Sequence, residues 1–168
     1  MRVLILVSQI SQGSAELLAV DLAQDLSKMG VDVSLASLRV DNKDKVKISN
    51  FENIDFHCLG YKSKHKLFNL IRIIFKLRKI IIQNKIDIIE TSSPSLGIIG
   101  SISIYGTNIR LLSGLHETFF KGKNKIKGGN TNSIRKKLFS FLTTIKSNVY
   151  FYAISEFVKQ TWINYSDT

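Results

Sequence analysis

Apolar and polar stretches alternate along this chain with lengths typical of strands and helices. The first run, RVLILVS at residues 2–8, is short, apolar and rich in β-forming residues, which predicts a strand buried on both faces. A helix is predicted next, because apolar residues recur there at helical spacing, at Ala15, Leu18, Leu22, Leu26 and Met29. Ser14 is placed to cap the start of this helix, and Gly30 is placed to end it.

The same alternation continues to the end of the chain. Strands are predicted at residues 31–38, 54–60, 86–90, 109–116 and 149–155, and helices at residues 66–85, 93–106, 133–147 and 156–165. Regular alternation of this kind is typical of an α/β domain with a mostly parallel sheet and helices on both of its faces. At 168 residues the chain is expected to form one domain with a sizeable core.

Composition points to a reducing compartment. Cys58 is the only cysteine, so it can form no internal disulfide. The apolar run at the N-terminus is short and is followed at once by polar residues, without a small-residue cleavage site, so no signal peptide is expected. No apolar run is long enough to span a membrane. We therefore expect a cytoplasmic protein that is either soluble or peripheral on the inner face of the membrane.

The net charge of +11 is unevenly distributed. Residues 1–60 hold six Lys and Arg against eight Asp and Glu, whereas residues 61–168 hold eighteen against five. That asymmetry predicts a face that meets an anionic partner. The basic stretches have few interleaved aromatic residues and no recognisable recognition module, so nucleic acid is not an expected partner.

The helix predicted from residue 66 carries an apolar stripe and a basic one. The apolar stripe comprises Leu67, Leu70, Ile71, Ile74, Leu77 and Ile81. The basic stripe comprises Arg72, Lys76 and Lys79. A basic amphipathic helix favours an anionic membrane surface. The same pattern equally suits a helix that packs on the sheet and leaves its lysines in solvent.

Chemistry in an open parallel sheet is expected at the carboxyl ends of the strands, where the strand order reverses. Gly13 and Ser14 follow the first strand, and a glycine beside the free N–H groups of a helix start suits a phosphate. A purely structural glycine in a tight turn is the other interpretation. The segment lacks the glycines of G-x-G-x-x-G and the lysine of a P-loop, so neither a nicotinamide cofactor nor ATP is expected.

Polar side chains follow two later strands. Glu90, Ser92 and Ser93 cluster after the fourth predicted strand, where their oxygens suit a polyhydroxylated ligand. Ser93 precedes Pro94 and can equally be a helix cap. His116 ends the fifth predicted strand, and a histidine there can transfer protons or bind a sugar hydroxyl or a phosphate. The paired cysteines of zinc sites are missing, so no metal site is expected.

Four blocks of the sequence, taken in order, resemble the N-terminal domain of glycosyltransferase family 4. The blocks are MRVLILVSQISQGSAELLAVDLAQDLSKMGVDVSLAS, KLRKIIIQNKIDIIETSSPSLGIIGS, IRLLSGLHETFF and VYFYAISEFVKQ. They look like the family's opening turn and helix, its helix–strand block with a polar end, its strand that ends in histidine, and its last strand running into Ser-Glu. The likeness covers essentially the whole chain. It implies a Rossmann-like domain that forms one half of a GT-B architecture.

The resemblance also implies roles for individual residues. Gly13 and Ser14 would face the donor diphosphate, and His116 would lie beside the reacting sugar as the catalytic residue. The acceptor side of the cleft would be lined by Glu90, Ser92, Ser93 and Glu117. Two positions depart from the family pattern: Ser14 stands where a second glycine is usual, and Glu90 stands where many members carry a histidine.

The activity implied by the resemblance is that of a retaining glycosyltransferase. Such an enzyme moves a sugar from a nucleotide-sugar donor, with no further cofactor, to a glycan or lipid-linked acceptor in the synthesis of surface polysaccharide such as lipopolysaccharide. Family members bind the nucleotide with a C-terminal domain, and residues 1–168 correspond to the N-terminal domain alone. We therefore expect the C-terminal domain to come from a longer polypeptide or a separate subunit, and the isolated chain to be inactive.

A second hypothesis belongs to another class of protein. The chain would then be a non-catalytic α/β binding module, or a truncated remnant, that engages a membrane or a protein partner. The surface at the carboxyl ends of the strands distinguishes the two hypotheses. An exposed apolar surface there favours a missing partner domain, whereas a fully polar one favours a self-sufficient module.

Overall fold

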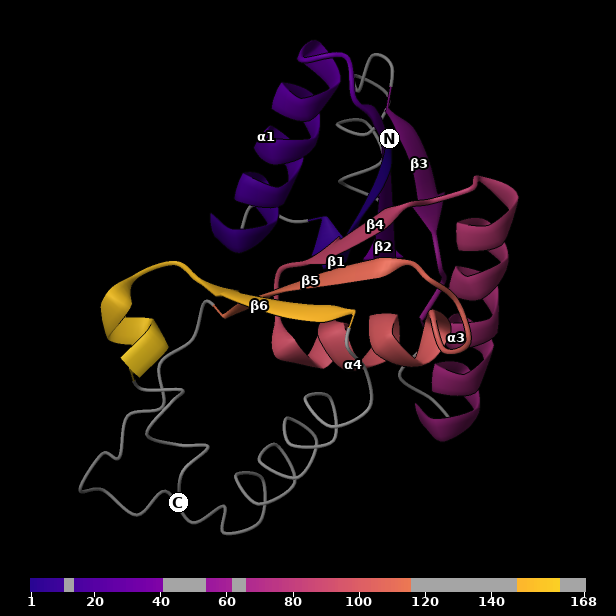
Figure 1. Cartoon of the computed structure of the whole chain (residues 1–168). Helices are drawn as coiled ribbons and strands as arrows, with labels where there is room; N and C mark the ends of the chain where they lie inside the picture. The colour runs from indigo at the N-terminus through magenta and orange to yellow at the C-terminus, as the bar shows by residue number, and fades with distance from the viewer. Residues whose placement is uncertain (11–13, 41–53, 62–65, 116–147, 161–168) are drawn as a thin grey trace, which may run out of the picture.

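The computed structural model describes residues 1–10, 14–40, 54–61, 66–115 and 148–160, and the described elements form a layered α/β domain (Figure 1). The strands are β1 (Arg2–Ile10), β2 (Asp32–Val40), β3 (Asp55–Cys58), β4 (Ile88–Thr91), β5 (Arg110–Leu115) and β6 (Val149–Ala153). The helices are α1 (Ser14–Lys28), α3 (Lys66–Gln83) and α4 (Pro94–Ser103). Residues 156–160 are also helical, whereas the helix predicted at 133–147 lies outside the described residues.

The six strands form one sheet in the order β3-β2-β1-β4-β5-β6, and each neighbouring pair is parallel. Helix α1 packs on one face of the sheet, and α3 and α4 pack on the other (Figure 1). The predicted α/β class, with a parallel sheet and helices on both faces, is therefore confirmed. The order of the strands reverses between β1 and β4, which makes this pair the switch point of the sheet.

Strand β1 is the centre of the core and is buried on both faces, as predicted. Leu4 and Leu6 point to the side of α3 and α4, and Ile5 and Val7 point to the side of α1. All four side chains are fully shielded from solvent. Burial of an aliphatic side chain of this size contributes about 2 kcal/mol to folding, so β1 is a main source of stability.

The helical period predicted for α1 is right, but its buried face is shifted. Ala19, Val20 and Ala23 pack against the sheet, whereas Leu18 and Leu22 are exposed. Small residues on the inner face let the helix axis come close to the strands, and the leucines then project away from the core. The helix ends before Gly30, whose φ of 79° is the left-handed conformation that favours glycine at a C-terminus.

The buried face of α3 also differs in part from the predicted apolar stripe. Leu77 and Ile81 are buried as predicted, together with Ile73. Leu67 and Ile71 were placed in the same stripe but are exposed. The helix is apolar on more than one side, so hydrophobic spacing alone could not identify which side faces the sheet.

Helix α4 begins and packs as the sequence SSPSLG predicts. Pro94 occupies the first turn, and the Ser93 hydroxyl caps the helix by accepting the backbone N–H of Leu96 at 3.5 Å. Gly97 lets the helix lie close to β5, because a Cβ at this position would come within 2.5 Å of the Ser113 hydroxyl oxygen. The chain therefore fixes the helix against the two strands that follow the switch point.

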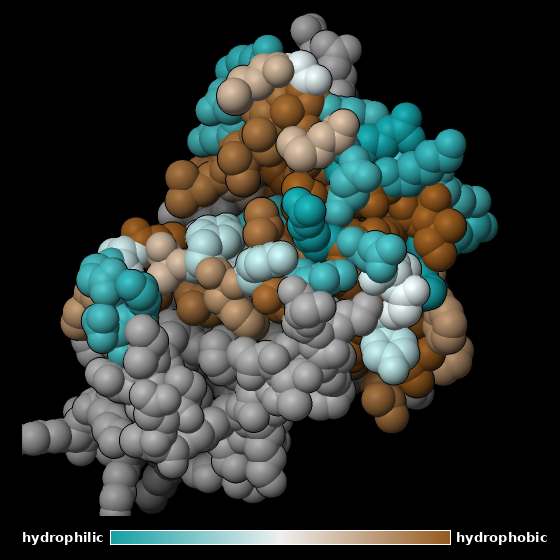
Figure 2. Space-filling model, viewed as in Figure 1, coloured by the Kyte–Doolittle hydropathy of each residue, from teal (hydrophilic) through white to brown (hydrophobic). Residues whose placement is uncertain are grey.

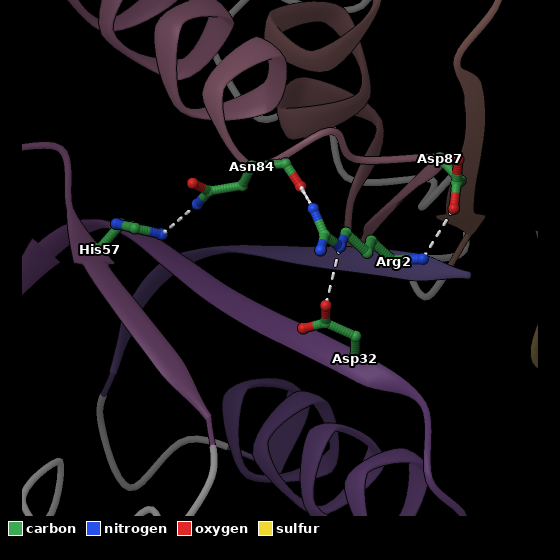
Figure 3. Close-up of polar contacts among 5 residues, drawn as sticks. All are labelled: Arg2, Asp32, His57, Asn84 and Asp87. Atoms are coloured by element: carbon green, nitrogen blue, oxygen red, sulfur yellow. Dashed lines mark hydrogen bonds and ion pairs between the residues drawn. The ribbon is translucent and has the colours of Figure 1, made fainter.

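A polar network joins the amino ends of β1 and β2, which we call the amino edge, to the turn before β4 and extends to His57 of β3 (Figure 3). The Arg2 side chain pairs with Asp32 at 2.9 Å and donates to the Asn84 carbonyl at 3.0 Å. The Arg2 backbone N–H donates to the Asp87 carboxylate at 2.8 Å. The amide nitrogen of Asn84 lies 3.1 Å from Nε2 of His57. These contacts tie β1, β2 and β3 to the turn between α3 and β4, which is a structural role.

Candidate functional site

The opposite end of the sheet carries a buried carboxyl group. Glu90 is the next-to-last residue of β4, and its backbone pairs with Ile5 of β1 and with Leu112 of β5. Only 6% of the residue is exposed. It therefore lies beside the switch point, near the carboxyl ends of the strands, which we call the carboxyl edge. Ligands of open parallel sheets bind at this edge.

Tyr152 of β6 reaches Glu90 across the intervening strand. Its hydroxyl donates a hydrogen bond of 2.6 Å to Oε1 of Glu90, so the two side chains meet above β5. Tyr150 is level with Glu90, because both are paired with Leu112. The hydrogen bond comes from Tyr152 instead, whose partner on β5 is Gly114. A glycine places no side chain between the strands on that face, and this leaves the path to Glu90 open.

Burial changes the acid–base properties of this pair. Loss of solvent raises the pKa of Glu90 to about 6, even though the hydrogen bond from Tyr152 lowers it. Burial and the neighbouring carboxyl group raise the pKa of Tyr152 above its ordinary value. Glu90 can therefore exchange a proton near neutral pH, whereas Tyr152 keeps its proton and acts as a donor.

The second oxygen of Glu90, Oε2, is shielded from solvent and has no hydrogen-bond partner among the described residues. A buried carboxylate oxygen without a donor costs free energy, so the group does not contribute to stability in its ionised form. Ser113 Oγ is the other such atom in the described part of the chain, and it lies under α4 against Gly97. Glu90 and Ser113 belong to opposite faces of the sheet and do not form one site.

The two serines predicted beside Glu90 differ in what they do. The Ser93 hydroxyl caps α4 and lies 3.2 Å from the Ser95 hydroxyl. The alternative prediction, that Ser93 is a helix cap, is therefore confirmed. Ser92 is half-buried in the turn between β4 and α4. The structure thus brings Ser92 and Ser93 to the carboxyl edge after Glu90, and it gives Ser93 a structural partner.

Several predicted site residues lie outside the part of the chain that the structure describes. Gly13, His116 and Glu117 are among them. Helix α1 begins at Ser14, which is the first described residue after β1. The roles predicted for Gly13, Ser14, His116 and Glu117 in donor binding, catalysis and acceptor binding stay predictions.

The basic stripe of α3 lies beside the end of β3. Arg72 donates to the Gly60 carbonyl at 2.7 Å, and Lys76 donates to the Cys58 carbonyl. Lys79 is exposed. Two of the three cations therefore donate hydrogen bonds to carbonyl oxygens at or just after the carboxyl end of β3, while all three stay on the surface. Their contact with a membrane stays a prediction.

Tyr152 is the functional candidate that sequence reasoning missed. The alternation in VYFYA predicts that Tyr150 and Tyr152 share one face of the strand. Which tyrosine reaches Glu90 depends on the register of β4, β5 and β6, and that register is not encoded in any one of these segments. Gly114 was the available signal, since a glycine in a strand often marks a close approach of other groups.

The described residues contain neither a metal-binding cluster nor a membrane-spanning helix. No group of three or more His, Cys, Asp and Glu side chains in the described ranges could hold a metal ion. No described helix is both long enough and apolar enough to cross a membrane.

Several solved structures of glycosyltransferases share the fold of this chain. HepE of Anabaena, in complex with UDP, superposes with a TM-score of 0.68 at 15% identity over 98% of this chain and 41% of its own. A glycosyltransferase from Rickettsia africae superposes with a TM-score of 0.69 at 22% identity over 99% of this chain and 41% of its own. The lipopolysaccharide outer core galactosyltransferase WaaB gives 0.69 at 12% identity, over 98% and 42%.

These neighbours have the two-domain GT-B architecture, and the present chain spans about 41% of the length of the first two. No curated protein sequence matches it significantly. At this level of identity the superpositions show the fold, a Rossmann-like domain like the N-terminal part of a GT-B enzyme. The sequence model of Glycosyltransferase Family 4 matches residues 15–167, which is nearly the whole chain. The chain therefore belongs to Glycosyltransferase Family 4.

Proposed function

We propose that this chain is the acceptor-side, N-terminal part of a retaining GT-B glycosyltransferase. The enzyme transfers a sugar from a nucleotide-sugar donor to a glycan or lipid-linked acceptor in surface polysaccharide synthesis. The match of residues 15–167 to Glycosyltransferase Family 4 carries this proposal. Two neighbours support its finer parts: HepE is solved with UDP and with UDP-glucose, and WaaB is a lipopolysaccharide galactosyltransferase.

The carboxyl edge supplies the chemistry that an acceptor needs. Glu90 and Ser92 are polar groups next to the switch point, and Tyr152 adds an aromatic ring. Pockets for small polar ligands combine aromatic surface with a few fixed polar groups in this way. Gly13 and His116 follow β1 and β5 in the sequence, and we assign them to the donor diphosphate and to the reacting sugar.

Apolar side chains at the carboxyl edge support a partner domain. Ile154 and Phe157 follow β6, and both are large, apolar and more than half exposed. A self-sufficient module has no use for such residues at its ligand-binding edge, whereas an interdomain surface does. We therefore favour the enzyme over the alternative of a non-catalytic binding module, and we assign this chain one half of the active site.

The test is transfer of radiolabelled sugar from UDP- and GDP-sugars to membrane lipid extracts. Residues 1–168 would be assayed alone and in the polypeptide expressed from the complete reading frame together with any glycosyltransferase subunit encoded next to it. We expect transfer by the complete assembly and none by residues 1–168 alone. Transfer by residues 1–168 alone would contradict the proposal that this chain forms only one half of the active site. No transfer by either preparation would overturn the proposed glycosyltransferase function.

We also propose that the outer face of α3 binds an anionic lipid surface. Apolar side chains three, four or seven residues apart project from this face, and Figure 2 shows apolar residues gathered over α3. The exposed ones are Leu67, Phe68, Ile71, Phe75 and Ile82. Lys79, Arg72 and Lys76 follow along one side of this apolar face. An apolar strip flanked by cations is the pattern of an interfacial helix.

Co-sedimentation with vesicles tests this attachment. We expect the chain to bind vesicles that contain phosphatidylglycerol and to bind pure phosphatidylcholine at least several-fold more weakly. Phe75→Ser and Lys79→Gln should each reduce binding to the anionic vesicles. Met29→Ser is the matched control, because Met29 is equally exposed but follows α1 on the other side of the sheet. Equal binding to the anionic and the neutral vesicles would contradict the electrostatic attraction. An equal loss of binding in Met29→Ser would contradict the assignment of the lipid-binding surface to α3.

A further inference from the structure

The Glu90–Tyr152 pair has the geometry of an anchor and a platform. The carboxyl group is buried, whereas 38% of Tyr152 is exposed on the α1 side of the sheet. The hydrogen bond holds the hydroxyl end of the ring, so the rest of the ring forms a fixed surface above β5. Only 6% of Glu90 is exposed, so Tyr152 presents the larger surface to a ligand.

The structural features around the pair indicate that it is kept for position rather than for stability. Glu90 leaves Oε2 without a donor among the described residues, and burial disfavours its charge. A buried ionisable group is often less stabilising than an apolar residue of similar size, but it can specify one arrangement. Here it specifies the ring position of a residue two strands away. Gly114, the partner of Tyr152 on the intervening strand, carries no side chain.

We propose that Glu90 is a positioning residue that anchors Tyr152, and that the exposed ring of Tyr152 is the surface on which a sugar ring of the acceptor stacks. The proposal rests on the glycosyltransferase function and specifies how its acceptor side recognises carbohydrate. A sugar ring presents C–H groups on its faces and hydroxyls at its rim. The face of an aromatic ring is apolar and matches the C–H groups, and the bond to Glu90 fixes where that face lies.

The anchor is tested by the titration of Glu90 itself, without any ligand. Residues 1–168 carrying ¹³C-labelled glutamate would be titrated by NMR as the wild type, as Tyr152→Phe and as Tyr150→Phe. In the wild type we expect the carboxyl group of Glu90 to titrate with a midpoint near pH 6, because burial raises its pKa and the hydrogen bond from Tyr152 lowers it by a smaller amount. Loss of that bond in Tyr152→Phe removes a donor to the ionised form, so the midpoint should rise.

Tyr150→Phe is the matched control, because Tyr150 lies on the same face of β6 and has no bond to Glu90. Its midpoint should equal that of the wild type. An unchanged midpoint in Tyr152→Phe would overturn the anchor, and an equal rise in both variants would overturn its assignment to Tyr152. Neither result depends on glycosyl transfer, so failure here is distinguishable from failure of the proposed function.

The platform is tested with simple sugars as probes. Saturation-transfer NMR would measure binding of the methyl glycosides of glucose, galactose, mannose and N-acetylglucosamine to the full chain. We expect at least one glycoside to bind, with loss of binding in Tyr152→Leu and a several-fold loss in Glu90→Leu, which keeps the ring but removes its anchor. Tyr150→Phe should bind as the wild type does.

Three results would overturn the platform. They are unchanged binding in Tyr152→Leu, unchanged binding in Glu90→Leu, and no binding of any glycoside by a chain whose complete assembly transfers sugar. If instead the glycosides bind and the variants behave as expected but no assembly transfers sugar, the platform stands as a carbohydrate site and the proposed transfer reaction falls.

Discussion

The two edges of the sheet carry charged residues of similar kind but use them in opposite ways. At the amino edge, Arg2 is paired with Asp32 and with backbone groups, and its side chain is partly exposed. At the carboxyl edge, Glu90 is buried, holds one partner and leaves one oxygen without a donor among the described residues. The charged groups described at the amino edge have hydrogen-bond or ionic partners, whereas one oxygen of Glu90 at the carboxyl edge has none among the described residues.

This difference separates structural polar groups from functional ones. A network that serves only the fold evolves toward complete pairing, because each unpaired buried group lowers stability. A site for ligands keeps groups whose pKa values and partners depart from that rule. By this criterion we place Glu90 in the proposed binding site, whereas Arg2, His57 and Asn84 form a structural clamp although they are more polar as a set.

The largest expected difference between the edges is in the pH dependence of stability. The pKa of Glu90 is raised from 4.5 to about 6 in the folded state, so folding favours its protonated form. Its contribution is fully present below about pH 4.5 and is lost as the pH rises through 6. A shift of this size corresponds to about 2 kcal/mol in the free energy of unfolding.

Urea unfolding of the wild type and Glu90→Gln between pH 4 and 8 measures this contribution. Glutamine has the same shape and cannot ionise, so the difference in unfolding free energy between the two proteins isolates Glu90. We expect the wild type to lose stability relative to Glu90→Gln as the pH rises, with the change centred between pH 4.5 and 6. A constant difference over the whole range would contradict the buried carboxyl group.

A smaller effect is expected at the amino edge. Arg2→Ala removes the ion pair with Asp32 and the bond to the Asn84 carbonyl, both at the surface. Such contacts contribute about 0.5 to 1 kcal/mol, and salt weakens them. Urea unfolding at 50 mM and 500 mM NaCl should therefore show a loss that shrinks at the higher concentration.

The control for that variant is Lys28→Ala, which removes an exposed pair with Asp25 within α1 and should have a still smaller effect. Arg2→Ala should also leave the titration midpoint of Glu90 unchanged. A shifted midpoint would show that the two edges are coupled and would break the distinction between clamp and site.

The fold was more accessible from the sequence than the site was. Short apolar runs such as RVLILVS stand out because a parallel strand is buried on both faces, and their alternation with helices fixes the class. The buried faces of α1 and α3 were harder to identify. Leu18 and Ile71 fit the helical period, yet they are exposed, because Ala19 and Ile73 lie on the sides that meet the sheet. Exposed apolar residues on a helix therefore produce the same periodicity in the sequence as residues of the core.

The candidate site was predictable only as far as single segments carry it. Glu90 follows from its place near the end of a predicted strand, and Ser93 was correctly given a helix-cap alternative. Tyr152 was not found, because its role depends on a contact between residues 62 positions apart. That contact requires the order of three strands and their register. Neither of these can be derived from the local pattern of one strand.

The smallest expected effect concerns His57, which lies at the side of the clamp. Its Nε2 is 3.0 Å from the Asp55 carboxylate, which is exposed, and 3.1 Å from the Asn84 amide. His57→Leu removes both contacts and should lower the free energy of unfolding by about 0.5 kcal/mol, because β3 is a short edge strand and its polar contacts compete with water. Glycoside binding and the midpoint of Glu90 should not change, since His57 lies on the edge strand β3, which β2 and β1 separate from β4. A change in either would show that a contact at the amino edge positions the carboxyl edge, and the clamp would then belong to the site.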